Sequence, residues 1–70
     1  MEFHAIDFKT AGEAIQYADA GGGRAILLDG PKVVTEAEAY RLEATGIEFA
    51  FLCDHEMPDG TFRIISIPVN

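Results

Sequence analysis

The sequence predicts a single α+β domain in the order β-α-β-β-α-β-β, with a mostly antiparallel sheet of four or five strands. Two capping-box sequences, Thr10-Ala11-Gly12-Glu13 and Thr35-Glu36-Ala37-Glu38, each follow a strand-like stretch and begin a helix. Two turn sequences, Asp29-Gly30 and Met57-Pro58-Asp59-Gly60, separate pairs of apolar runs. Because hairpins pair antiparallel strands, we expect a two-layer sandwich with both helices on one face of the sheet.

The first strand and helix occupy the N-terminal third of the chain. Residues Glu2 to Phe8 are rich in aromatic and β-branched side chains and alternate imperfectly, which is typical of a strand. A helix follows Thr10, and Gly21-Gly22-Gly23 ends it with a left-handed residue and a flexible link. Small side chains form its apolar stripe, which indicates close packing on a flat sheet: Ala11, Ala14, Ile15 and Ala18.

The first hairpin joins Ala25–Leu28 to Lys32–Val34 through Asp29-Gly30. Aspartate and glycine both tolerate the positive φ angles that tight hairpin turns require. Pro31 stands beside the turn and has no N–H to donate. We therefore expect the second strand of this hairpin to lie at an edge of the sheet.

The second helix is predicted from Glu36 to Thr45, and signals at both of its ends agree. Gly46 is suited to a left-handed stop, and Leu42 and Ile47 occupy the positions that touch in a Schellman motif. Val34 and Ala39 occupy the positions of a hydrophobic staple. The predicted apolar stripe contains Ala37, Tyr40 and Ala44, widened by Ala39 and Leu42.

The second hairpin closes the chain. Residues Ile47 to Cys53 alternate cleanly, with the two phenylalanines on the same face as Ile47 and Cys53. The turn at residues 57–60 has proline at its second position and glycine at its fourth, as type I turns favour. Residues Thr61 to Ile67 form the last strand, and Pro68 fits an edge strand or a strand end.

Composition limits how the domain is stabilised. Seventy residues with 49% apolar content suffice for one core over residues 1–70, but a chain of this size buries only about 60% of its surface on folding. The single cysteine, Cys53, excludes an internal disulfide. A metal, self-association or efficient packing must therefore supply the additional stability.

The net charge of −7 disfavours binding to nucleic acid or to an anionic membrane, because both carry negative charge. No apolar run is long enough to span a bilayer, and the first residues lack the features of a secretion signal. With one unpaired thiol, the chain is expected in the cytoplasm. Mimicry of nucleic acid is an alternative use of the acidic residues, but their scattered placement favours a solvated surface.

The densest group of potential metal ligands is Cys53-Asp54-His55-Glu56. In a strand, Cys53 and His55 project from one face, and with His4 and Glu56 they form a candidate zinc site. The spacing matches no standard zinc motif, so the alternative is a buried cysteine followed by solvated polar residues. A metal-binding or small-ligand-binding protein, enzymatic or not, is thus the second functional hypothesis.

Other catalytic or phosphate-binding chemistry has little support in the sequence. A Cys53–His55 nucleophile lacks a visible oxyanion hole, and the acidic surroundings disfavour a thiolate. Gly21-Gly22-Gly23-Arg24 leaves a helix and enters a strand, whereas phosphate loops enter a helix N-terminus. No carboxylate stands in an apolar setting that would tune its pKa. The chain is therefore predicted to be non-enzymatic.

The sequence contains more apolar strand residues than one layer of helices can cover. If both helices lie on one face of the sheet, the opposite face exposes a patch of the kind that marks an interface. A twofold homodimer, or another protein partner, would cover it. The residues predicted at this contact are Ala50, Leu52, Phe62 and Ile64, with Ile65 and Ile67 in place of the last two if the register differs. The alternative is a sheet that curls, or a C-terminal segment Ile67-Pro68-Val69 that folds over the exposed face.

Overall fold

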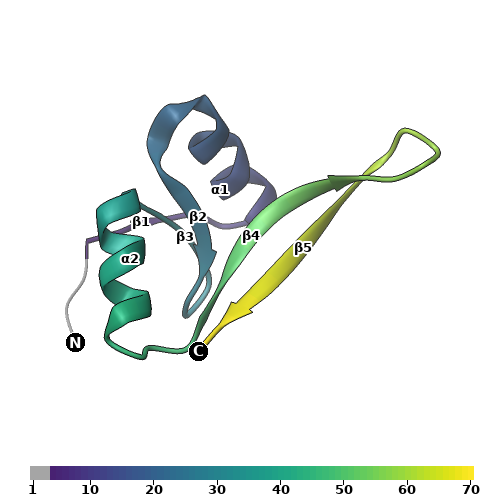
Figure 1. The fold of residues 1–70 in the computed structure, drawn as a ribbon. Helices are drawn as coiled ribbons and strands as arrows, with labels where there is room; N and C mark the ends of the chain where they lie inside the picture. The colour runs from purple at the N-terminus through teal and green to yellow at the C-terminus, as the bar shows by residue number, and fades with distance from the viewer. Residues whose placement is uncertain (1–3) are drawn as a thin grey trace.

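Five strands form one antiparallel sheet in the computed structural model, which describes residues 4–70 (Figure 1). The order of elements confirms the predicted β-α-β-β-α-β-β arrangement and the α+β class. The sheet order is β1-β3-β2-β4-β5. The elements are β1 (Ile6–Asp7), α1 (Ala11–Tyr17), a π-helical turn η1 (Ala18–Gly22), β2 (Arg24–Leu27), β3 (Pro31–Val34), α2 (Glu36–Ala44), β4 (Phe49–Glu56) and β5 (Phe62–Val69).

The first strand is shorter than predicted, and it changes the position of β3. Within residues 4–70 only Ile6 and Asp7 are extended in β1, and the first residues of the predicted strand, 2 and 3, lie outside the described part. β1 pairs with β3, so β3 is an inner strand and the predicted edge position is wrong. Pro31 is tolerated there because it is the first residue of the strand, where its carbonyl accepts from the Phe8 N–H at 3.0 Å.

The two helices lie on opposite faces of the sheet, which corrects the predicted two-layer arrangement. On one face, α1 packs with Ala25, Val33 and Leu52. On the other face, α2 packs with three side chains from the same three strands, Ile26, Val34 and Phe49. Each central strand is therefore covered on both sides, and the core consists of two clusters separated by the sheet.

The strand order explains this arrangement. The connection from β1 to β2 passes over β3, and the connection from β3 to β4 passes over β2, in the same direction across the sheet. β1 and β3 run antiparallel, so the two crossovers start in opposite directions. Crossovers between parallel strands are almost always right-handed. The two crossovers can both be right-handed only if α1 and α2 lie on opposite faces of the sheet.

The predicted first helix and its glycine stop are confirmed. The Thr10 hydroxyl accepts from the Glu13 N–H at 3.2 Å, and the four residues of the predicted apolar stripe all contact the core cluster of α1. The glycines after the helix are more than a flexible link. A methyl group on Gly23 would lie 2.2 Å from the Val34 carbonyl oxygen, and Gly23 has a φ of 117°. Glycine at this position therefore lets η1 end close against β3.

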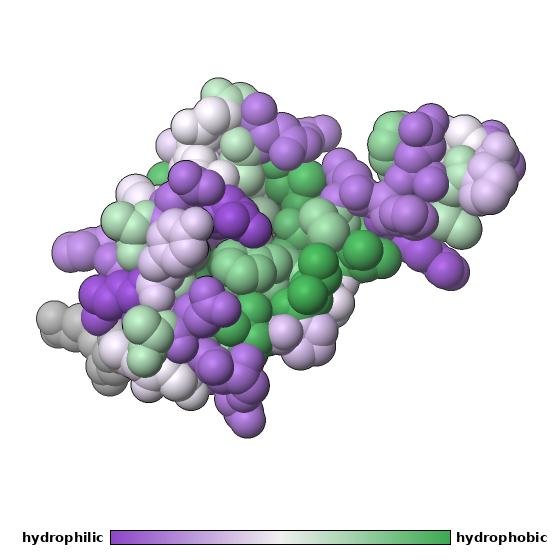
Figure 2. All heavy atoms as spheres, in the orientation of Figure 1, coloured by the Kyte–Doolittle hydropathy of each residue, from purple (hydrophilic) through white to green (hydrophobic). Residues whose placement is uncertain are grey.

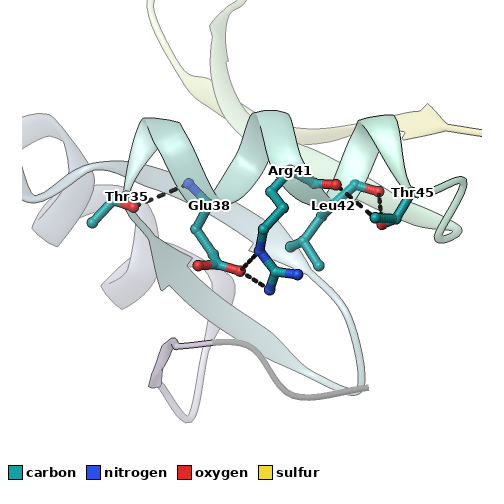
Figure 3. A network of polar contacts seen from close by, with 5 residues as sticks. All are labelled: Thr35, Glu38, Arg41, Leu42 and Thr45. Atoms are coloured by element: carbon teal, nitrogen blue, oxygen red, sulfur yellow. Dashed lines mark hydrogen bonds and ion pairs between the residues drawn. The ribbon is translucent and has the colours of Figure 1, made fainter.

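Both ends of α2 form as the sequence predicts, and Figure 3 shows the threonine cap at its N-terminus. The Thr35 hydroxyl accepts from the Glu38 N–H at 3.1 Å. At the other end, the Ile47 N–H donates to the Leu42 carbonyl at 3.3 Å, which is the long bond of a Schellman motif. The Glu38 carboxylate does not complete the capping box but accepts hydrogen bonds from the Arg41 guanidinium.

The side of α2 that packs on the sheet differs from the predicted stripe. Ala39 and Leu42 are buried, whereas Tyr40 is 68% exposed and Ala37 and Ala44 are exposed. The residues at the helix ends explain the rotation: Val34 before the helix and Ile47 after it lie in the same cluster as Ala39 and Leu42. These two contacts direct Leu42 rather than Tyr40 toward the sheet.

Candidate interaction surface

β5 is an edge strand whose side chains are largely exposed. Of its eight residues, only Ile65 and Val69 are half-buried. Phe62, Ile64 and Ile67 are exposed by 68%, 46% and 50%. Natural edge strands are usually short, charged or covered, because a long apolar edge invites pairing with another chain. β5 is long and apolar and carries one charged residue, Arg63, so it is the most conspicuous surface of the fold.

The outer part of the β4–β5 hairpin projects beyond the rest of the fold (Figure 1). β4 pairs with β2 only at Ala50 and Phe51, but it pairs with β5 along its whole length. From Asp54 to Ile64 the hairpin is thus a two-stranded ribbon, which we call the arm. It makes the molecule elongated, with extents of 41 × 22 × 19 Å. A two-stranded ribbon is marginally stable alone, so the arm gains from any added strand.

The turn at the tip of the arm is well ordered by hydrogen bonds. The Gly60 N–H donates to the Met57 carbonyl at 2.9 Å, and the Met57 N–H donates to the Thr61 carbonyl at 2.7 Å. The Asp59 carboxylate accepts from the Thr61 hydroxyl at 2.6 Å and from the Thr61 N–H at 3.0 Å. These bonds, the hydroxyl first, lower the pKa of Asp59 below its ordinary value because they favour the charged carboxylate.

We expect Thr61→Val to raise the pKa of Asp59 toward its ordinary value, because the hydroxyl donor is lost while the backbone donor remains. The folded pKa is lower than the unfolded pKa, so the ionised carboxylate stabilises the turn above the unfolded pKa. This contribution is lost as the pH falls through the folded pKa. Carboxyl carbon NMR titration of both proteins measures the shift directly. An unchanged midpoint in Thr61→Val would show that the hydroxyl has no such role.

The outer edge of β5 offers a defined set of backbone groups. Residue pairs in an antiparallel ladder alternate between hydrogen-bonded and non-hydrogen-bonded positions. The bond from Met57 to Thr61 fixes the phase of this alternation along the continuous register between β4 and β5. Phe62, Ile64, Ser66 and Pro68 therefore direct their backbone groups away from β4. Proline has no N–H, so the outward donors are those of Phe62, Ile64 and Ser66.

Apolar side chains also lie beside α2 on the face opposite α1. Figure 2 shows them gathered over the part of β4 and β5 next to α2, with polar residues farther out along the arm. The register places Phe51 and Ile67 side by side on this face, followed by the pair of Cys53 and Ile65. All four are at least partly exposed. Both faces of β5 therefore present apolar surface next to its free edge.

The four residues predicted at the contact share one face of the sheet, as the register of β4 and β5 shows. Their exposure differs, however. Leu52 is only 9% exposed, because α1 covers it, and Ala50 is half-buried. Phe62 and Ile64 belong to the exposed strand described above. The premise of a bare sheet face is thus wrong, and the exposed surface is the edge strand and the arm.

The residues of the predicted zinc site are not brought together. His4 precedes β1 at one edge of the sheet, whereas Cys53 and His55 lie in β4, three strand positions away. Neighbouring strands are about 4.8 Å apart, so roughly 14 Å separates these strands. Glu56 faces the side of β4 opposite Cys53 and His55. Among residues 4–70, no three histidine, cysteine or acidic side chains form a group able to hold a metal ion.

A cleft of about 370 Å³ opens where β2 and β4 separate, next to the end of α1. The Arg24 guanidinium beside it lies 4.3 Å from the centre of the Phe51 ring and 3.9 Å from the Glu36 carboxylate. Asp19 and Asp54 also line the cleft. These carboxylates and the nearby helix C-terminus disfavour a phosphate, so the glycine segment is a helix stop rather than a phosphate loop.

These features define a small α+β protein with a projecting arm and an exposed apolar edge strand. Comparison with known proteins gives no match: no family model fits the sequence, and no curated protein or solved structure resembles it significantly. Within residues 4–70, neither helix has the length and apolar character needed to cross a membrane.

Proposed function

We propose that this protein is a small non-enzymatic module that binds proteins through β5, with a second copy of the same chain as its partner. The observation that carries the proposal is that the outer edge of β5 pairs with no strand of residues 4–70 and that apolar side chains are exposed on both faces of β5. Addition of a strand to such an edge is a common mode of protein recognition, in which main-chain hydrogen bonds supply affinity and side chains supply specificity.

The charge distribution supports β5 as the contact. The protein carries twelve acidic residues and a net charge of −7, so two copies repel each other over most of their surfaces. No acidic residue occurs between Gly60 and Asn70. Contact through β5 therefore keeps carboxylates from facing each other. We also propose a cytoplasmic location, which the single free thiol of Cys53 supports, because proteins of oxidising compartments usually pair their cysteines.

We expect Ile64→Lys to abolish self-association, because it places a charge at the middle of the free edge, as natural edge strands do to prevent pairing. Sedimentation equilibrium of the wild-type chain should show a mass that rises from 7.6 kDa toward twice that value with concentration. Tyr40→Lys is the matched control, since Tyr40 is also an exposed apolar residue but lies on α2. It should associate like the wild type.

Two results would contradict the proposal. One is a wild-type chain that stays monomeric up to about 1 mM, which corresponds to a binding free energy weaker than about 4 kcal/mol. The other is association that Ile64→Lys leaves unchanged, because the contact would then lie elsewhere. Circular dichroism spectra of the variants establish that each is folded before its mass is interpreted.

A further inference from the structure

We infer that two copies pair through antiparallel β5 strands in one specific register, in which Ile64 of each copy lies opposite Ile64 of the other. This inference rests on the proposed self-association. A twofold axis through the edge makes the two strands antiparallel and joins the two sheets into one. The residues whose backbone groups point away from β4 must then lie opposite one another. The only possible registers are therefore those that pair members of the set Phe62, Ile64, Ser66 and Pro68 with each other.

The register centred on Ile64 uses every available donor. It places Phe62 opposite Ser66 of the second copy, Ile64 opposite Ile64, and Ser66 opposite Phe62. The three outward N–H groups of each copy then all find carbonyl partners, and Pro68 lies outside the paired set. Side-chain sizes also match, because the large ring of Phe62 faces the small side chain of Ser66 in both halves of the pairing. Phe62 is 68% exposed in a single copy, so it gains the most from this contact.

The two neighbouring registers each contain a specific defect. A register centred on Arg63 places Arg63 directly opposite Arg63 of the second copy, and like charges at that position are destabilising. A register centred on Ile65 places Phe62 opposite Pro68, which cannot donate the required hydrogen bond. In the register centred on Ile64, Arg63 lies opposite Ile65, where its aliphatic stem packs on an apolar side chain. Arg63 and Pro68 thus exclude the alternatives on either side.

This pairing also supports the arm. The arm of one copy, including Phe62, lies beside the part of β5 that is joined to the helix-covered sheet in the other copy. The two-stranded ribbon becomes part of a four-stranded one, β4-β5-β5-β4, around the twofold axis. Sheets of three or more strands are stable where a lone ribbon is marginal. We therefore expect the amide protons of Phe62, Ile64 and Ser66 to exchange more slowly as the protein concentration rises.

Disulfide trapping tests the register. In a Cys53→Ser background, Ile64→Cys should form a covalent dimer in a glutathione redox buffer, because hydrogen-bonded antiparallel pairs have Cα atoms about 5.5 Å apart, within disulfide range. Ile65→Cys is the matched control in the adjacent position. In this register its two copies are diagonal neighbours about 7–8 Å apart, too far for an unstrained disulfide. Tyr40→Cys measures random collision at an exposed site on α2.

Each outcome is decisive. Dimer formation by Ile64→Cys well above the levels of Ile65→Cys and Tyr40→Cys supports the register. Preferential trapping of Ile65→Cys overturns the register. If Ile64→Lys abolishes association in that case, the proposed function stands without this register. If the chain associates but neither β5 variant is trapped above Tyr40→Cys, strand pairing through β5 is wrong. A chain that is monomeric by sedimentation overturns the proposed function together with this inference.

Discussion

Gly23→Ala is expected to lower the free energy of unfolding by about 2–6 kcal/mol, which is a large part of the stability of the domain. An added methyl group would lie 2.2 Å from the Val34 carbonyl oxygen, a backbone atom that cannot move without disturbing β3. Gly23 also has a φ of 117°, which side chains rarely allow. Strained backbone and overpacking each cost about 1–3 kcal/mol. Their combined cost approaches the total stability of a 70-residue domain, which is about 4–10 kcal/mol.

Gly12→Ala is the control for this substitution. Gly12 lies in the first turn of α1, and the nearest atoms to an added methyl group are 4.0 Å away. Alanine is the better helix former by about 0.5–1 kcal/mol, so this variant should be slightly more stable than the wild type. Urea denaturation followed by circular dichroism measures both variants. A Gly23→Ala protein with a wild-type midpoint would show that the segment after α1 is a loose link.

Leu42→Ala is expected to lower the free energy of unfolding by about 2–5 kcal/mol, because it leaves a cavity between α2 and the sheet. Leu42 is fully buried and packs with Ile26, Val34 and Phe49. For a domain of this size, a loss of 2 kcal/mol lowers the melting temperature by about 8–16 °C. Thermal unfolding followed by circular dichroism measures the change.

Tyr40→Ala is the matched control for Leu42→Ala, and it distinguishes the two possible orientations of α2. The sequence stripe includes Tyr40, but the structure leaves it 68% exposed. Truncation at such a surface position changes stability by about 0.5 kcal/mol or less. If Tyr40→Ala is the more damaging of the two variants, the rotation of α2 described above is wrong.

The local signals of the sequence predicted the elements well because each depends on a few neighbouring residues. The threonine caps, the Schellman motif after α2 and the turn at the arm tip all occur where the residue types indicate. The alternation along β4 correctly predicted the face shared by Phe49 and Phe51. The rotation of α2 was missed because Ala39 and Tyr40 are both acceptable on an apolar stripe, and tertiary contacts choose between them.

The candidate surface was predicted only in part. Phe62 and Ile64 are exposed, and alternation predicts that they share a face with each other, but only the register of β4 and β5 places them on the face of Ala50 and Leu52. The burial of Leu52 could not be predicted from the sequence, because it depends on which face of the sheet α1 covers. No residue next to Leu52 in the chain determines that face. The edge position of β5 is one of two alternatives at the sequence level, because an edge is defined by which strand lies last in the sheet. Pro68 is the local signal of this edge, because proline cannot donate a hydrogen bond to a neighbouring strand.

The number and order of the elements and the ends of the helices follow from the sequence, since capping, turn geometry and alternation act over a few residues. The sheet order, with β1 beyond β3 and β5 at the far edge, depends on pairing between strands far apart in the chain and follows from no local pattern. The sheet order in turn decided the opposite placement of the helices, because the hand of a crossover depends on the direction and spacing of strands far apart in the chain. The exposed edge of β5 is a consequence of the same long-range pairing.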